Sequence, residues 1–159
     1  MDTYSEQLVK KTPTSSDGMK KIAVFGCGIA LTAILVFLAF SVTTFILFAV
    51  ALVIYGIYWL LTGMNIEYEY IVTNGSIDID KIISQRKRVT LLSVDVKDFT
   101  EFDTYDNQPF DGTVYHAVGG ECPLMYADFP DSQNGTSRLV FAPDEKTLEC
   151  IKPYLRIRK

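Results

Sequence analysis

The chain has 159 residues and a formal net charge of −4, with 48% hydrophobic residues. Its length suits one ordinary domain or a small domain with a membrane anchor. Residues 65–159 carry 16 acidic and 11 basic side chains, which argues against nucleic-acid binding because that depends on neutralising phosphates. The three cysteines form no CxxC motif or His/Cys cluster, so we expect no metal and no cofactor.

The first segment, residues 1–19, is rich in serine, threonine and lysine. It has no hydrophobic period, and Pro13 and Gly18 interrupt it. These features predict a flexible N-terminal tail that ends where a membrane segment begins.

A long uncharged run follows, because no charged residue lies between Lys21 and Glu67. As a helix, the 45 residues Ile22–Ile66 would extend about 67 Å, whereas the hydrocarbon core of a bilayer is about 30 Å thick. A soluble chain of this size could not bury such a run. A cleaved signal peptide is not expected either, because its apolar region has only about 7–15 residues.

We therefore predict a transmembrane helical hairpin over residues 20–63, with spans at about 22–40 and 43–62. The turn is expected near residues 40–44, where the polar residues of the run cluster. This turn contains no proline, glycine or charge, so a single long or kinked segment remains the alternative.

Residues typical of the membrane interface flank both spans. Lys20 and Lys21 precede the first span, and Tyr55, Tyr58 and Trp59 lie near the far end of the second. Amphipathic aromatic side chains concentrate at the headgroup level, and lysines anchor span ends. We predict that these five residues are interface anchors.

The lysines also predict the topology of a multi-pass protein of the cell membrane. Four lysines lie in residues 1–21, and the expected loop between the spans has no charge. Positive charge resists translocation, so the N-terminus should be cytoplasmic, and a two-span hairpin returns residues 65–159 to the cytoplasm. With a single span, that domain would lie outside.

The spans contain no ionisable residue, which argues against a pump or transporter acting alone. Gly26, Gly28 and Ala30 place small residues where helices could approach closely. This pattern fits a packing surface between the two spans or between protomers of a homo-oligomer, and it equally fits a permissive apolar helix.

At Ile66 the spacing of the apolar residues changes from a helical period to a period of two. This change predicts a half-buried antiparallel strand. Asn74-Gly75, the pair favoured in type I′ turns, separates this strand from a second that begins near Ile77. Both strands carry acidic residues on what we expect to be a water-facing side.

The rest of the chain predicts a mainly-β domain of five to seven antiparallel strands. Further strands are expected at about residues 81–84, 88–92, 95–102, 123–129 and 137–142, with a loop at 104–113. Residues 143–152 then show a helical pattern, with Pro143 suited to a first turn. This C-terminal helix should cap the sheet.

Residues 70–88 (YIVTNGSIDIDKIISQRKR) and 91–99 (LLSVDVKDF) resemble the start of bacterial membrane-anchored pleckstrin-homology-like domains. Residues 139–152 (LVFAPDEKTLECIK) resemble the closing strand and helix of a family of short, uncharacterised two-span proteins of this kind. The resemblance implies a bent seven-stranded sheet capped by a C-terminal helix. Residues 103–136 do not match, and the resemblance implies no chemistry.

Arg86, Lys87 and Arg88 form the basic cluster of residues 65–159. They could contact anionic lipid headgroups or a partner, since each basic residue near such a surface contributes about 1 kcal/mol. The sequence slightly favours the other interpretation, a solvated loop whose basic residues balance the surrounding acids.

Other polar residues carry weaker signals. Asp78 and Asp80 share a face of their strand, but no third carboxylate at a fixed spacing suggests a metal site. His116 lacks a recognisable nucleophile or phosphate loop beside it. The sequence patterns for glycosylation at Asn74 and Asn134 follow from Asn-Gly turns and would not be used in the cytoplasm.

The sequence therefore favours a non-enzymatic integral membrane protein that presents a cytoplasmic pleckstrin-homology-like binding or scaffolding module. Its partners would be the lipid bilayer and an unidentified protein, peptide or lipid surface. The alternative is a small accessory subunit of a larger membrane complex that acts through its transmembrane helices. An enzyme would require Asp78, Asp80 or His116 to meet in one pocket.

Overall fold

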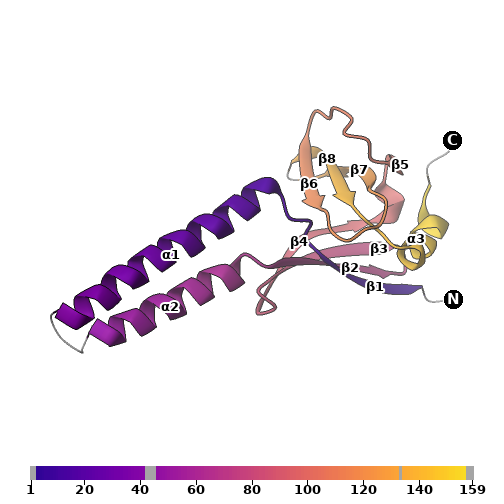
Figure 1. The fold of residues 1–159 in the computed structure, drawn as a ribbon. Helices are drawn as coiled ribbons and strands as arrows, with labels where there is room; N and C mark the ends of the chain where they lie inside the picture. Colours follow the sequence, from indigo (N-terminus) through magenta and orange to yellow (C-terminus); the bar gives the residue numbers. More distant parts are fainter. Residues whose placement is uncertain (1–2, 42–45, 133, 157–159) are drawn as a thin grey trace. The chain divides into compact units, whose positions relative to one another are not determined.

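The computed structural model describes residues 3–132 and 134–156, apart from 42–45. The chain divides into two compact units, one formed by residues 13–65 and the other by residues 1–12 together with 66–159. In Figure 1 the helical unit runs from indigo to magenta, and the β unit contains one indigo strand from the N-terminus with the elements coloured from magenta to yellow.

The helical unit is a pair of apolar helices, α1 (Ser15–Ser41) and α2 (Ile46–Gly63), which run side by side (Figure 1). Both are long and apolar enough to cross a membrane, over Ser15–Ala39 and Ile46–Gly63. These stretches extend about 37 Å and 27 Å. Residues 40 and 41 of the predicted turn at 40–44 belong to α1, and the rest of that turn lies outside the described residues.

Helix α1 begins at Ser15, five residues before the start that the lysine pair suggested. The carboxylate of Asp17 accepts a hydrogen bond from the backbone N–H of Thr14 (3.3 Å), and the carbonyl of Thr14 accepts from the backbone N–H groups of Asp17 and Gly18. This local turn starts the helix, because it pairs backbone groups that the first turn leaves open.

The first sheet contains four antiparallel strands in the order β1-β2-β3-β4. Their bounds are Tyr4–Lys10, Ile66–Thr73, Ser76–Ile83 and Lys87–Asp95. The predicted hairpin is confirmed, with Thr73 paired to Ser76 across the Asn74-Gly75 turn. Asn74 and Gly75 have φ angles of 49° and 86°, as a type I′ turn requires.

Strand β1 corrects the prediction of a flexible N-terminal tail. It pairs with β2 along its whole length, from Tyr4 opposite Thr73 to Lys10 opposite Glu67. The β domain therefore includes residues 1–12 and does not begin at residue 65. This strand was not recognisable in the sequence because two of its three inward-facing residues, Ser5 and Gln7, are polar.

The second sheet also has four strands, in the order β5-β7-β8-β6. They are β5 (Glu101–Thr104), β6 (Thr113–Ala117), β7 (Met125–Asp131) and β8 (Gly135–Phe141). A 3-10 turn, η1 (Val96–Asp98), leads into it. Two four-stranded sheets thus replace the expected single seven-stranded sheet, and β6 pairs with β8 in parallel.

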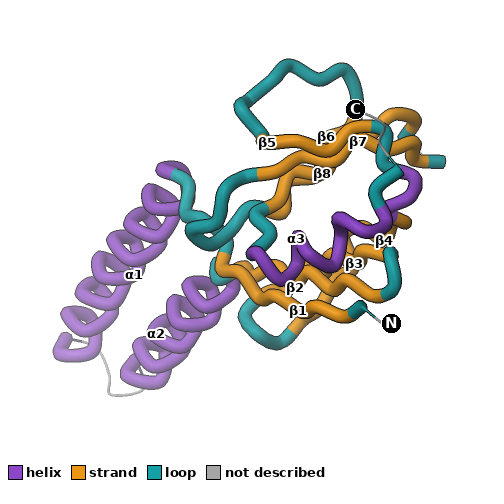
Figure 2. Tube along the Cα trace, turned by 90° about the vertical axis from the view of Figure 1, so that its right-hand side faces the viewer, coloured by secondary structure: helices purple, strands orange, loops and turns teal. Residues whose placement is uncertain are grey.

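The C-terminal helix α3 (Glu145–Ile151) lies beside β1 and β2 (Figure 2) and continues into the 3-10 turn η2 (Lys152–Tyr154). Asp144 is its N-cap and accepts a hydrogen bond from the backbone N–H of Thr147 (2.7 Å). The helix is slightly shorter than the predicted 143–152, and its Ile151 is fully buried in the core.

The core of the β unit lies between the two sheets. Its side chains share complete or nearly complete burial, and the largest of those that are fully buried are Tyr70, Ile77, Ile79, Leu139, Phe141 and Ile151. The ring of Tyr70 meets that of Phe141 edge to face, with centroids 5.7 Å apart. Apolar contacts of this kind pack the first sheet against the second.

Candidate functional site

The predicted basic cluster lies at the turn between β3 and β4. Ser84 and Gln85 both have φ near 56°, and the backbone N–H of Arg86 donates to the carbonyl of Ile83 (3.1 Å). This tight turn presents Arg86 and Lys87 as exposed side chains. The two of them could meet an anionic surface.

Arg88 differs from its two neighbours, because it is committed to acids of the same sheet. Its Nη2 lies 2.8 Å from Oε2 of Glu69, and its Nε lies 3.7 Å from Oδ2 of Asp80. The Arg88 side chain is still about half exposed. The basic cluster therefore contains two exposed side chains, Arg86 and Lys87, and one arginine, Arg88, that forms ion pairs within the sheet.

The acidic side of the β2–β3 hairpin is more buried than the sequence suggested. Glu67, Glu69 and Asp80 have exposed fractions of only 8%, 5% and 8%. Glu69 lies directly opposite Asp80 in the pairing of the strands, and the side-chain amide of Gln85 reaches Glu67 (3.4 Å). Neighbouring strands and long side chains shield these carboxylates, which an isolated hairpin would leave exposed to solvent.

Burial raises the pKa of Glu69 above its ordinary value, and the carboxylates of Glu6 and Asp80 add to this effect. The Arg88 guanidinium opposes it. The hydrogen bond from Arg88 is directed at Oε1 of Glu69 (3.0 Å), so Oε2 is near the cation but has no well-directed donor. This arrangement is an ionic cluster within the sheet.

The residues considered for metal binding or catalysis do not form a site. Oδ1 of Asp78 accepts a hydrogen bond from Ser93 (2.5 Å), and Asp80 faces Arg88. His116 is exposed on β6, in the other sheet. Among residues 3–132 and 134–156, outside 42–45, no three His, Cys, Asp or Glu side chains are placed to hold a metal ion.

Sequence reasoning missed a polar groove of about 350 Å³ in the β unit. Its acidic lining residues are Asp95, Asp98 and Asp131, and serines at 76, 93 and 132 also face it. Lys97 pairs with Asp95 at 2.5 Å. The groove joins the end of β4 to the turn after β7, segments far apart in the sequence, so no local pattern could reveal it.

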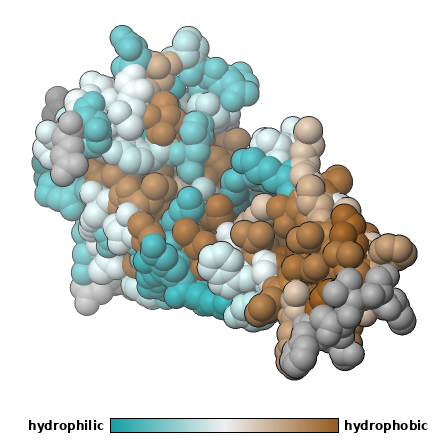
Figure 3. All heavy atoms as spheres, turned by 90° about the vertical axis from the view of Figure 1, so that its left-hand side faces the viewer, coloured by the Kyte–Doolittle hydropathy of each residue, from teal (hydrophilic) through white to brown (hydrophobic). Residues whose placement is uncertain are grey.

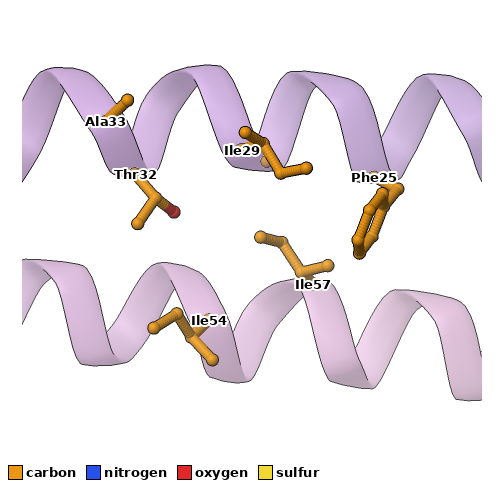
Figure 4. Close-up of a pocket in the computed structure, with 7 residues that line it drawn as sticks. Phe25, Ile29, Thr32, Ala33, Ile54 and Ile57 are labelled. Atoms are coloured by element: carbon orange, nitrogen blue, oxygen red, sulfur yellow. The ribbon is translucent and has the colours of Figure 1, made fainter.

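The two apolar helices contact each other through Gly28. A Cβ atom at this position would lie 2.3 Å from Cδ1 of Ile57, whereas one at Gly26 would meet nothing within 4 Å. Beside this contact lies an apolar groove of about 430 Å³. Figure 4 shows its lining residues on both helices: Phe25, Ile29, Thr32, Ala33, Ile54 and Ile57.

The predicted interface anchors are all exposed on these helices. Lys20 and Lys21 lie near the start of α1, and Tyr55, Tyr58 and Trp59 have exposed fractions of 65%, 56% and 57% on α2. Apolar side chains cover the visible face of the helices in Figure 3. An exposed apolar surface of this kind marks a site of contact with a membrane or with another protein.

Comparison with known protein families gives a match over nearly the whole chain. A family model described as "Bacterial PH-like domain (DUF6106)" matches residues 1–158, where PH stands for pleckstrin homology. No curated protein and no solved structure matches the chain.

Proposed function

Because this chain belongs to the DUF6106 family of bacterial PH-like domains, we propose that it is a two-span integral membrane protein. Its PH-like domain is presented on the cytoplasmic face as a binding or scaffolding module. Its mechanism is tethering rather than catalysis: the spans confine the domain to the membrane plane and raise its effective concentration for partners there.

The pairing of β1 with β2 carries this proposal. Strand β1 ends five residues before α1 begins, and β2 begins three residues after α2 ends. The two strands form one antiparallel pair, closed by a hydrogen bond from the backbone N–H of Lys11 to the carbonyl of Ile66 (2.9 Å). The chain that enters the bilayer through α1 must therefore leave it on the same side, which two spans achieve and one span cannot.

The charge distribution supports the cytoplasmic side for both ends. Lys10, Lys11, Lys20 and Lys21 precede or open the first helix, and positive charge resists translocation. The hydrophobic lengths of α1 and α2 suit the bilayer core. The exposed Tyr55, Tyr58 and Trp59 then serve as anchors at the interface.

The exposed pair Arg86 and Lys87 is the proposed contact with anionic headgroups or with a protein partner. Each basic side chain near an anionic leaflet contributes about 1 kcal/mol. Two charges give a weak contact, which becomes useful only because the spans already hold the domain at the membrane.

The test of this function is in-cell labelling of a cysteine at the exposed Asp111, with Cys27, Cys122 and Cys150 replaced by serine. We expect a membrane-impermeant maleimide to modify Asp111→Cys only after the cells are lysed. Modification in intact cells would overturn the cytoplasmic placement. Recovery of the protein in the soluble fraction after cell breakage would overturn the membrane assignment.

A second experiment separates the module from the accessory-subunit alternative. Full-length protein carrying Arg86→Ser and Lys87→Ser is compared with an Ile29→Trp variant, which fills the groove between the helices. Loss of bound partners or of vesicle binding in the double variant supports the module. Loss only in Ile29→Trp favours an accessory subunit that acts through its helices.

A further inference from the structure

Strand β1 is held by polar contacts to an unusual degree. Three of its side chains face the interior, and their exposed fractions are 0% for Ser5, 9% for Gln7 and 6% for Val9. Only Val9 joins the hydrophobic core. Most of what fixes β1 is therefore hydrogen bonding to β2, to the region of α3 and, through the carbonyl of Lys10, to the backbone N–H of Gly120 (3.1 Å).

The side-chain amide of Gln7 makes two opposed hydrogen bonds with backbone groups that lead into α3. Its Nε2 donates to the carbonyl of Ala142 (3.0 Å), and its Oε1 accepts from the backbone N–H of Asp144 (2.8 Å). Two residues earlier on the same face, the hydroxyl of Ser5 lies 3.1 Å from the hydroxyl of the buried Thr147. The N–H of Asp144, the carbonyl of Ala142 and the hydroxyl of Thr147 therefore bind side chains at alternate positions of one strand.

We propose that the surface covered by β1, which is formed by the edge of β2 together with Ala142, Asp144 and Thr147, is a peptide-binding site whose built-in ligand is β1. We call it the strand-acceptor groove. It selects an extended segment with a hydroxyl residue, a glutamine and a valine at alternate positions. A peptide of this pattern displaces β1 and takes its place.

The selectivity follows from β-augmentation, in which main-chain hydrogen bonds supply affinity and pockets for alternate side chains supply specificity. A side chain that lacks an amide at the position of Gln7 would leave the Ala142 carbonyl and the Asp144 N–H without partners. Buried polar groups without partners are costly, so the groove discriminates strongly at that position.

Release of β1 is favoured by its place in the fold. It is an edge strand with a single partner strand, and elements with few buried apolar contacts open most easily. The groups that hold Ser5 and Gln7 return to water when the strand leaves. Docking also brings Glu6 toward the buried Glu69, and the like charges oppose it.

The test uses the full-length protein in detergent micelles and a fluorescent synthetic peptide of residues 2–12. Three proteins are compared: wild type, Gln7→Ala, and Leu8→Ala as a matched control, since Leu8 faces outward and is 57% exposed. We expect the wild-type peptide to bind the Gln7→Ala protein about ten- to a hundredfold more tightly than wild type, because the weakened resident strand competes less. The Leu8→Ala protein should behave as wild type.

The converse experiment places the changes in the peptide and keeps the Gln7→Ala protein. A peptide with Gln7→Ala should bind about ten- to a hundredfold more weakly than the wild-type peptide, and one with Leu8→Ala should bind nearly as well. If the Gln7→Ala protein is poorly folded, added wild-type peptide should restore its resistance to protease, which is a second measure of the same binding.

Three results would overturn the proposal. The first is absence of peptide binding and of protease rescue with the Gln7→Ala protein. The second is an equal loss of affinity for the Gln7→Ala and Leu8→Ala peptides. The third is hydrogen exchange in the wild-type protein as slow for β1 as for Ile77 and Ile79 of β3. These measurements need no bilayer, so their outcome is independent of the proposed membrane topology.

Discussion

The hydroxyl of Tyr70 on β2 donates a hydrogen bond to the backbone carbonyl of Ala117 on β6 and so joins the two sheets through one fully buried side chain. The same hydroxyl accepts from the backbone N–H of Ala142 (3.3 Å). Burial raises the pKa of Tyr70, which keeps this hydroxyl protonated as a donor.

Tyr70→Phe should therefore destabilise the β unit by about 1–3 kcal/mol, because it leaves buried backbone groups without a partner. Urea denaturation followed by tyrosine fluorescence of the β unit would measure the change. Tyr4→Phe is the control, since its hydroxyl bonds only to Glu6 at an exposed site and its loss should leave the midpoint unchanged. Equal midpoints for all three proteins would contradict the role of Tyr70.

Arg138 on β8 is a second buried polar anchor. Its guanidinium forms a two-bond pair with Asp128 at 2.6 and 2.7 Å and lies between the rings of Phe110 and Tyr126, about 4.3 and 4.2 Å from their centroids. Arg138→Met removes one partner of a buried ion pair and should cost about 3–5 kcal/mol.

Arg138→Lys should recover only part of that loss, because an ammonium group cannot reproduce the planar fork. Lys97→Met, which breaks an ion pair at the surface, should have no measurable effect. Hydrogen exchange would also rise in residues 105–112 of the Arg138→Met protein, since Phe110 would lose its contact. Unchanged exchange there would show that the arginine does not hold this loop.

The raised pKa of Glu69 predicts a pH dependence of stability. Between the ordinary value of 4.5 and the raised folded-state pKa, the folded chain keeps a proton that the unfolded chain releases. Stability from this group is therefore fully present below the ordinary value and falls as the pH rises through the folded-state pKa. Burial is the main cause, opposed by Arg88 and reinforced by Glu6 and Asp80.

Glu69→Gln should flatten this part of the curve of unfolding free energy against pH. Denaturant midpoints from pH 4 to pH 8 would measure it, with Glu145→Gln at the exposed start of α3 as the control. A slope that persists in Glu69→Gln would assign the dependence to other groups.

The two Asn-Gly turns differ in what surrounds their glycines. Gly75 and Gly135 have similar positive φ angles of 86° and 76°, so alanine at either site costs about 1–2 kcal/mol of backbone strain. A Cβ at Gly75 would also lie 2.5 Å from the ring of Tyr154, whereas one at Gly135 would meet nothing within 4 Å.

Gly75→Ala should therefore destabilise the β unit more than Gly135→Ala, by an additional 1–3 kcal/mol or so for the forced movement of Tyr154. Thermal unfolding of the two variants side by side would measure the difference. Equal losses would mean that the ring of Tyr154 moves aside at no cost.

The sequence predicted the elements whose signals are local. Uncharged length identified the two helices, and alternation with Asn74-Gly75 identified the β2–β3 hairpin, because the type I′ turn depends on the residues within it. The C-terminal helix was recognisable from its helical pattern, but it begins at Glu145 with Asp144 as its cap, so Pro143 precedes the helix and does not lie in its first turn. The strands β7 and β8 were predicted within two residues of their observed ends.

What escaped prediction depends on contacts between distant residues. Strand β1 has no apolar alternation, since Ser5 and Gln7 are satisfied by backbone and hydroxyl groups more than 130 residues away. The parallel pairing of β6 with β8 joins segments separated by another strand. Arg88 could not be distinguished from Arg86 and Lys87 until the partners Glu69 and Asp80 were placed beside it.

The adjacency of Lys11 and Ile66 has a practical consequence for preparing this protein. Because these residues are hydrogen-bonded neighbours at the end of the β1–β2 pair, residues 13–65 are an insertion within a β-hairpin. Truncation at residue 65 would remove a strand along with the helices. Joining Thr12 to Ile66 through a short glycine-containing turn would instead keep both strands, and would give a compact domain suited to solution NMR and crystallisation without detergent.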